Sequence, residues 1–172
     1  MKTRQDEGFT LIELLIVVAI ISIIAAIAVP GLTRSRMAGN ETSASQSLRA
    51  INVAEVQYSM ACGNQGFAVS FQVLATPSPG STEPFIGADF AVPNPIKAGY
   101  LFTLAPGAGA VAGPNDCNGT ATQSAYYATA IPQTFNSTGG KSFATNQSAT
   151  IWQVNAAAAP TEPFGPPATP LQ

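Results

Sequence analysis

The sequence predicts an α+β protein in which one long N-terminal helix packs against a small antiparallel β-sheet. Three observations predict it. Residues 11–29 form an apolar run that only Glu13 and Ser22 interrupt. Residues 32–61 continue with apolar side chains at helical spacing. Four short runs rich in aromatic and β-branched residues then follow between positions 100 and 154, each bounded by Gly, Pro or Asn. Short strands laid against an amphipathic helix make an α+β domain.

The apolar run is long enough to cross a membrane. Thirteen of the residues from 11 to 29 are Leu, Ile or Val. A helix of this length spans about 28 Å, close to the hydrocarbon thickness of a bilayer. Because every backbone polar group in lipid must be bonded within the segment, helix is the workable conformation. Transfer of so many apolar side chains outweighs the cost of one carboxylate near the end, so we expect insertion despite Glu13.

An ionisable side chain in a membrane segment is costly and points to a functional role. The hexapeptide G-F-T-L-I-E at 8–13, continued by apolar sequence to Pro30, resembles the N-terminal signature of type IV pilins and of the pseudopilins of type II secretion. The resemblance implies that a membrane peptidase cleaves between Gly8 and Phe9 and that Phe9 is then N-methylated. It also implies that Glu13 guides docking of the subunit into a growing filament.

Two other interpretations of the N-terminus stay open. An ordinary secretory signal peptide has a basic start and a small-residue cleavage site, which the sequence A-I-A at 26–28 offers. Against it, two acidic residues adjoin the apolar run and Glu13 lies inside it. A plain single-span anchor needs neither Gly8 nor Glu13. The combination of short charged leader, glycine, aromatic residue, glutamate and long apolar helix favours the pilin-like interpretation.

Composition argues against an enzyme. The chain has no histidine, which is the commonest general base and metal ligand, and no nucleophile motif. Calcium needs several converging oxygen ligands, but after residue 89 the only acids are Asp116 and Glu162. We therefore expect no catalytic residues, no metal and no cofactor. The net charge of −2 gives no basic field for nucleic acid. An enzyme or sensor head on a single anchor is the alternative from a different class.

The chain divides into six predicted segments. They are a leader peptide (1–8), a transmembrane or filament-core helix (9–31), an amphipathic helix of the head (32–62), a variable loop (63–98), an antiparallel sheet (99–155) and a Pro-rich tail (156–172). Pro30 is expected to kink the helix because it removes the hydrogen bond to the carbonyl of Ala26. The tail holds five prolines and one charge, so we expect it to stay out of the sheet, extended and mobile.

One face of the amphipathic helix is apolar. It is formed by Ala44, Leu48, Ile51, Ala54 and Tyr58. Glu41, Arg49 and Glu55 are charged positions of this segment, and Gly63 is placed to cap its end. Cys62 and Cys117 fit neither a C-x-x-C nor a zinc pattern. Because an exported head lies in an oxidising compartment, we expect one disulfide, with two free thiols as the alternative.

The predicted strands cover residues 100–104, 125–130, 142–145 and 150–154, with hairpin connections at 139–140 and 146–148. The resemblance implies a structural subunit that is cleaved, methylated and polymerised into a type IV pilus. Its partners are then other copies of itself, the prepilin peptidase/N-methyltransferase, the pilus assembly platform in the inner membrane and, before assembly, the lipid bilayer. Its location is the inner membrane and then the extracellular pilus. The alternative is a pseudopilin of a type II secretion system, in a periplasmic pseudopilus.

Overall fold

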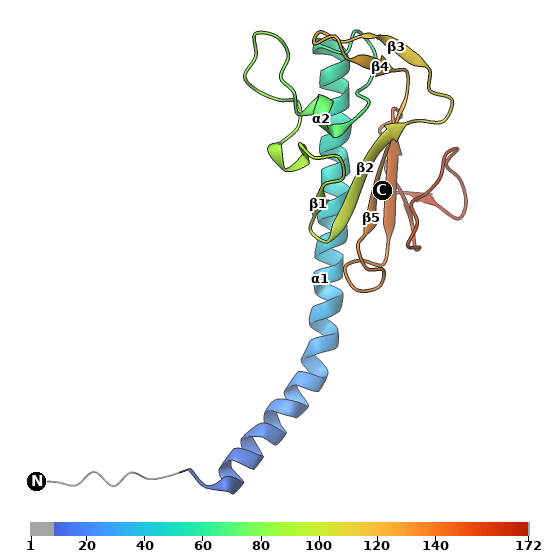
Figure 1. Cartoon of the computed structure of the whole chain (residues 1–172). Coiled ribbons are helices and arrows are strands. Elements are labelled where there is room, and N and C mark those ends of the chain that lie inside the picture. Colours follow the sequence, from blue (N-terminus) through green and yellow to red (C-terminus); the bar gives the residue numbers. More distant parts are fainter. Residues whose placement is uncertain (1–8, 172) are drawn as a thin grey trace, which may run out of the picture. The chain divides into compact units, whose positions relative to one another are not determined.

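The computed structural model describes residues 9–171, so the leader, including Gly8, lies outside the described residues. The chain divides between Arg36 and Met37 into two units, which are described separately. The helix α1, Leu11–Ala61, begins in the first unit and ends in the second (Figure 1). Residues 37–171 are called the head below.

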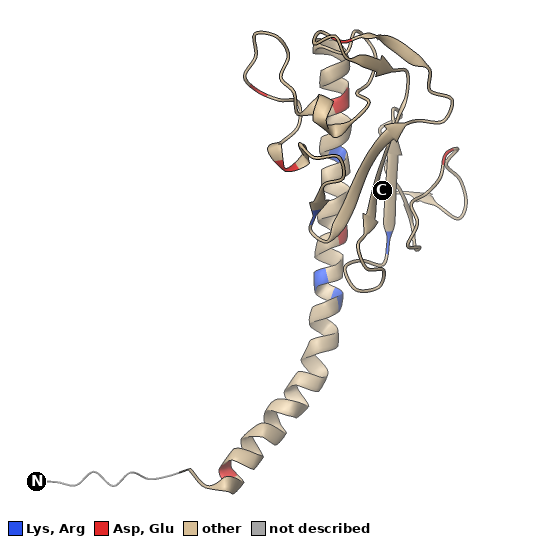
Figure 2. Ribbon diagram, viewed as in Figure 1, with Lys and Arg blue, Asp and Glu red and all other residues tan. Residues whose placement is uncertain are grey.

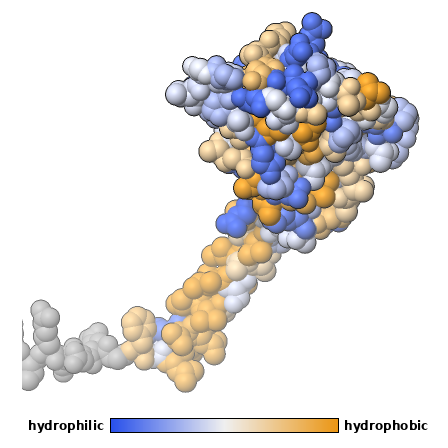
Figure 3. Space-filling view, turned by 45° about the horizontal axis from the view of Figure 1, so that its top comes forward, coloured by the Kyte–Doolittle hydropathy of each residue, from blue (hydrophilic) through white to orange (hydrophobic). Residues whose placement is uncertain are grey.

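The N-terminal unit consists of the apolar part of α1. Its large apolar side chains are all at least half exposed, and Figure 3 shows this surface as mostly hydrophobic. By length and composition alone, α1 is long and apolar enough to cross a membrane. No charged residue lies between Glu13 and Arg34, as the uncoloured stretch in Figure 2 shows. The helix continues through Pro30, and a kink at this residue stays a prediction.

The head contains a six-stranded antiparallel sheet in the order β1-β2-β5-β6-β7-β8. The strands are β1 (Ile96–Lys97), β2 (Tyr100–Pro106), β5 (Tyr126–Pro132), β6 (Ser142–Asn146), β7 (Trp152–Val154) and β8 (Thr169–Pro170). The four strongest strand patterns correspond to β2, β5, β6 and β7, and each of these pairs with a neighbour in antiparallel register. The predicted α+β fold, a long helix against an antiparallel sheet, is confirmed.

The core lies between the sheet and the part of α1 that belongs to the head. All five residues of the predicted apolar face of the helix are at most 1% exposed. From the sheet, Tyr100, Phe102 and Phe143 pack into the same cluster. Large aromatic side chains from the sheet and the small residues Ala44 and Ala54 from the helix are therefore buried in one core.

The loop from 63 to 98 is fastened to this core by aromatic residues. It contains the short helix α2 (Phe71–Leu74) and the 3-10 turn η1 (Ala88–Phe90). Phe71 and Phe90 are buried, and the Phe90 ring packs at 5.5 Å from that of Phe71 and 5.3 Å from that of Phe102. A second, two-stranded sheet of β3 (Ala112–Asn115) and β4 (Ala121–Gln123) follows. Its Gly and Pro content hides it from a strand pattern.

At the end of α1, the residues in the left-handed conformation differ from the glycine that the sequence predicts as the cap. The left-handed backbone conformation that ends the helix belongs to Asn64 (φ 49°) and Gln65 (φ 69°), not to Gly63. Gly63 is required for another reason, since a Cβ there would lie 2.4 Å from the carbonyl oxygen of Gly66 and 2.8 Å from the Tyr58 ring. Asparagine tolerates the left-handed region, so it takes the capping position that glycine usually holds.

The C-terminal segment is where the structure corrects the sequence most clearly. The prediction that it stays out of the sheet is wrong: β8 pairs with β7, in the register Trp152 opposite Pro170. At a sheet edge, proline is tolerated because one side of the strand needs no donor. The Tyr127 hydroxyl donates to the carbonyl of Pro160, and the Glu162 carboxylate accepts the N–H of Ala108.

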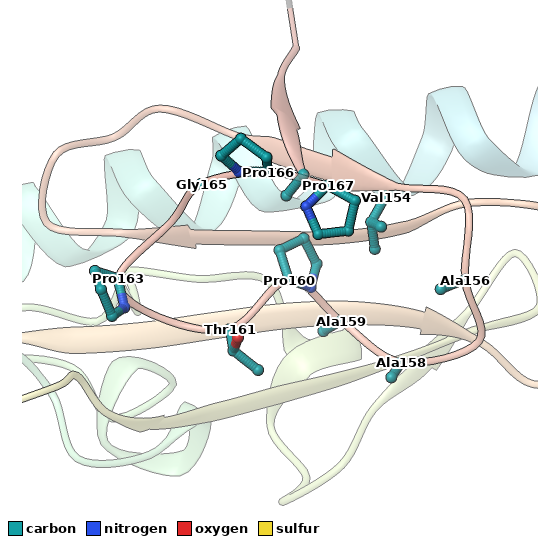
Figure 4. A pocket seen from close by; sticks show the side chains of 11 residues that line it. Val154, Ala156, Ala158, Ala159, Pro160, Thr161, Pro163, Gly165, Pro166 and Pro167 are labelled. Carbon is teal, nitrogen blue, oxygen red and sulfur yellow. The ribbon is translucent and has the colours of Figure 1, made fainter.

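The segment also folds back on itself around a cavity of about 240 Å³ (Figure 4). Its lining is uncharged, and only Val154 comes from outside residues 156–168. The Phe164 ring stacks on Trp152 with centroids 5.5 Å apart. The ring of Tyr127 lies 6.3 Å from that of Phe164. The proline-rich segment therefore docks on the head. Aromatic stacking and side-chain hydrogen bonds hold the part of it that lies outside β8 and has no strand pairing.

This docking gives an optical test, since Trp152 is the single tryptophan of the chain. Phe164→Ala is expected to shift tryptophan emission to longer wavelength and to lower the free energy of unfolding by about 1 kcal/mol, the usual worth of an aromatic pair. Phe135→Ala, which removes a 36% exposed ring elsewhere on the head, is the matched control and should leave emission unchanged. Identical spectra for Phe164→Ala and the native chain would contradict a docked C-terminal segment.

Candidate functional site

Glu13 is held at the start of α1 by Thr10. The Glu13 Oε2 atom accepts the backbone N–H of Thr10 at 3.1 Å and its hydroxyl at 2.8 Å. The Thr10 Oγ1 atom in turn accepts the backbone N–H of Glu13 at 3.2 Å. Two otherwise unpaired donors of the first turn are thus satisfied reciprocally, which is the capping box of a helix N-terminus. The sequence therefore starts a helix immediately after Thr10.

Thr10 is a site residue that the sequence prediction missed. The spacing T-x-x-E at 10–13, followed by an apolar run, is the signal that predicts it. The arrangement fixes the Glu13 side chain against the helix end. Within residues 9–171, the hydrogen bonds to this carboxylate all go to Oε2.

Phe9 and the helix after it present an apolar surface. Phe9 is 88% exposed and Leu11 81%. The first described residue of the predicted cleavage pair is thus accessible, and its partner Gly8 lies outside the described residues. In water, so large an exposed apolar surface has to be covered, by lipid or by protein.

The part of α1 in the head has an outer face that the sheet does not cover. Between residues 42 and 60, its exposed residues are Thr42, Gln46, Arg49, Ala50, Val53, Val56, Gln57 and Met60. Val53 is 56% exposed and Met60 83%. With one charged residue among them, this outer face is far less polar than a helix surface turned to water usually is.

The far end of α1 is tied to the loop between β3 and β4. Cys62 and Cys117 form a disulfide with Cα atoms 4.8 Å apart, which confirms the predicted bridge. Beside it, the Cys117 N–H donates to the carbonyl of Cys62 at 2.8 Å. The Tyr58 hydroxyl donates to Asp116 Oδ2 at 2.8 Å, and burial, followed by this hydrogen bond, raises the pKa of Tyr58.

Asp116 is committed to structure rather than to a ligand. Its Oδ1 atom accepts the N–H groups of Asn118 at 2.9 Å and Thr120 at 2.7 Å. Glu162, the other acid after residue 89, is held by Ala108 and Asn146. Among residues 9–171, no group of three or more His, Cys, Asp and Glu side chains is placed to hold a metal ion.

Comparisons with known proteins agree with this geometry. Residues 3–29 match the family model described as the prokaryotic N-terminal methylation motif. The chain is 38% identical over 79 residues to the type IV wide pilus major component PilA4 of Thermus thermophilus. This match covers 44% of this chain and 60% of that protein. It is 43% identical over 54 residues to the type IV major pilin protein PilA of Myxococcus xanthus, covering 31% of this chain and 24% of that protein. No solved structure matches.

The chain thus combines a match to the N-terminal methylation motif with an exposed apolar helix of membrane-spanning length and an α+β head. Over part of its length, the chain is similar to two proteins named as type IV pilus components. Both relatives are named as structural pilus components, and neither is an enzyme. The chain spans less than two thirds of the length of either relative.

Proposed function

We propose that the protein is a major structural subunit of a type IV pilus. It is synthesised as a precursor in the inner membrane, cleaved between Gly8 and Phe9, methylated on the new N-terminus and polymerised. The observation that carries this proposal is the coincidence of the methylation motif with a helix whose apolar side chains are all exposed. A surface of this kind suits lipid before assembly and neighbouring helices after it.

The filament is built by two features of α1. The apolar part from Leu11 to Leu32 packs with the same part of other copies in the filament core, while the heads form the outer wall. The weakly polar outer face of the helix in the head, with Ala50 and Val53 near its middle, allows a neighbouring subunit to approach without desolvating many charges. Pro30 allows the helix to bend between the two parts.

The partners follow from these steps. They are other copies of the chain, a prepilin peptidase that also transfers the methyl group, and an assembly platform in the inner membrane. The finished location is the cell surface. Both relatives are named as pilus components, which favours a pilus over a secretion pseudopilus.

Processing is tested at Gly8. Glycine presents no side chain, so an extended backbone at this position can lie close to a protease. Gly8→Leu is expected to leave an uncleaved precursor in the membrane and to reduce fibre yield at least tenfold. Gln5→Leu, which adds the same side chain three residues earlier, is the matched control and should be cleaved normally. The measurement is the N-terminal sequence of the membrane-bound chain, and normal cleavage of Gly8→Leu would contradict the proposal.

A further inference from the structure

Glu55 is an acid in the interior of the head. Its exposed fraction is 0%, although the amphipathic pattern places it among the charged positions of the helix. The Oε2 atom accepts the N–H of Ala68 at 2.9 Å. The Oε1 atom is buried and has no hydrogen-bond partner. Within the described part of the chain, no Lys or Arg pairs with this carboxyl group. A buried carboxylate without a counter-charge is unfavourable.

The side chain of Gln123 binds the same residue as Glu55, namely Ala68. It is 4% exposed, and its Nε2 atom donates to the carbonyl of Ala68 at 2.7 Å. Its side-chain Oε1 atom is also buried without a partner. The backbones of Gln123 and Phe67 exchange two hydrogen bonds, at 2.8 and 3.1 Å, so this side chain is held in place. Two unsatisfied oxygens therefore belong to side chains that bind the N–H and the C=O of one residue, Ala68.

We propose that Glu55 is a protonated acid in the folded head and that its Oε1–H donates to the side-chain oxygen of Gln123. One proton, taken from solvent on folding, then satisfies both orphaned oxygens. The hydrogen bonds form a closed ring, from the Ala68 N–H through Glu55 and Gln123 back to the Ala68 carbonyl. The ring joins α1, the segment at 67–68 and β4.

The titratable groups around Glu55 supply no positive charge that would stabilise its carboxylate. Tyr58 faces it from α1 and Tyr126 from β5, and burial raises the pKa of each tyrosine, so both are neutral hydroxyls near neutral pH. Asp116, in the loop after β3, lies behind the Tyr58 hydroxyl. None of these three groups supplies a positive charge to Glu55. Burial raises the pKa of Glu55 from the usual 4.5 to about 8, although the hydrogen bond from Ala68 opposes the change.

A proton-linked stability follows. Between pH 4.5 and about pH 8 the folded head holds the Glu55 proton and the unfolded chain does not. Since folding then takes up one proton, the folding equilibrium constant falls about tenfold for each pH unit of increase in this window. The contribution is complete below pH 4.5 and is lost as the pH rises through 8.

The test uses the full-length chain in detergent micelles. Glu55→Gln supplies a neutral side chain that can accept from Ala68 and donate to Gln123 as the protonated acid does. It is expected to fold at pH 7 and to remove the pH dependence of urea unfolding between pH 5 and 8. Glu41→Gln is the matched control, because Glu41 also accepts a backbone N–H, from Gly140 at 2.9 Å, but is not buried. This control should keep the native pH dependence.

Infrared spectroscopy observes the proton directly. At pH 7 the native chain should show a carboxylic acid C=O band that Glu41→Gln retains and Glu55→Gln lacks. Gln123→Leu should keep the band and shift it, since the acid loses its acceptor. A native-minus-Glu55→Gln spectrum with carboxylate bands alone would overturn the proposal. Failure of Glu55→Gln to fold would count against it too, because a neutral donor should be tolerated.

Discussion

Replacing Glu13 by alanine is expected to abolish fibre formation while leaving the chain in the membrane and normally cleaved. Under the proposed function, cleavage would leave a free amine on Phe9, and the carboxylate of one subunit could pair with the amine of another. An unpaired carboxylate is costly in lipid, so docking relieves a penalty as well as forming a contact. A subunit that is displaced along the filament axis leaves its carboxylate unpaired, which makes Glu13 a determinant of register. The measurement is sheared-fibre yield relative to membrane-bound mature chain.

The capping box requires two controls, because alanine at position 13 also removes the partner of Thr10. Glu13→Gln keeps the box, since glutamine reciprocates with threonine as glutamate does, but it loses the charge. Thr10→Ala keeps the charge and loses the hydroxyl. If charge drives docking, Glu13→Gln fails to assemble and Thr10→Ala assembles. Two results would contradict the docking role. One is wild-type fibre yield from Glu13→Ala. The other is loss of fibres in Thr10→Ala while Glu13→Gln still assembles.

Removing the disulfide is expected to cost the head about 4 kcal/mol of unfolding free energy, from the loop-closure entropy of a bridge across 55 residues. The double variant Cys62→Ala/Cys117→Ala should therefore unfold at much lower urea concentration. The hydrogen bond from Tyr58 to Asp116 remains in the variant and limits the local loosening.

Reduction gives an independent measure of the same bridge. Reductant should destabilise the native chain to the level of the double variant and leave the variant unchanged. The native mass should rise by two hydrogens on reduction. A loss below about 1 kcal/mol would mean that the unfolded chain is already held together near these residues, contrary to the chain-entropy argument.

The parts of the fold that local pattern predicts are those with strong periodicity. Thirteen large aliphatic residues between 11 and 29, and the 3–4 spacing from Ala44 to Tyr58, leave little choice but helix. β8 was missed because its two residues, Thr169 and Pro170, pair only at a sheet edge and carry no strand pattern. The docking of Phe164 on Trp152 depends on a contact that no local pattern encodes.

The candidate site divides in the same way. The cost of a charge in an apolar run singles out Glu13, whereas Thr10 required attention to the helix start. The helix pattern predicts an ordinary charged position at Glu55 because its partners are distant, with Ala68 13 residues and Gln123 68 residues further along the chain. A loop that is distant in sequence buries the Glu55 side chain, and the spacing of residues within the helix does not predict this burial.

The intact mass of the chain in purified surface fibres tests the central claim most directly. A subunit of a type IV pilus should have a mass that begins at Phe9, with one added methyl group and two hydrogens fewer than the reduced form. Fragmentation should place the methyl group on the N-terminal amine. Fibres that lack this chain, or a mature chain that begins at Val29 as an ordinary signal peptide requires, would contradict the account.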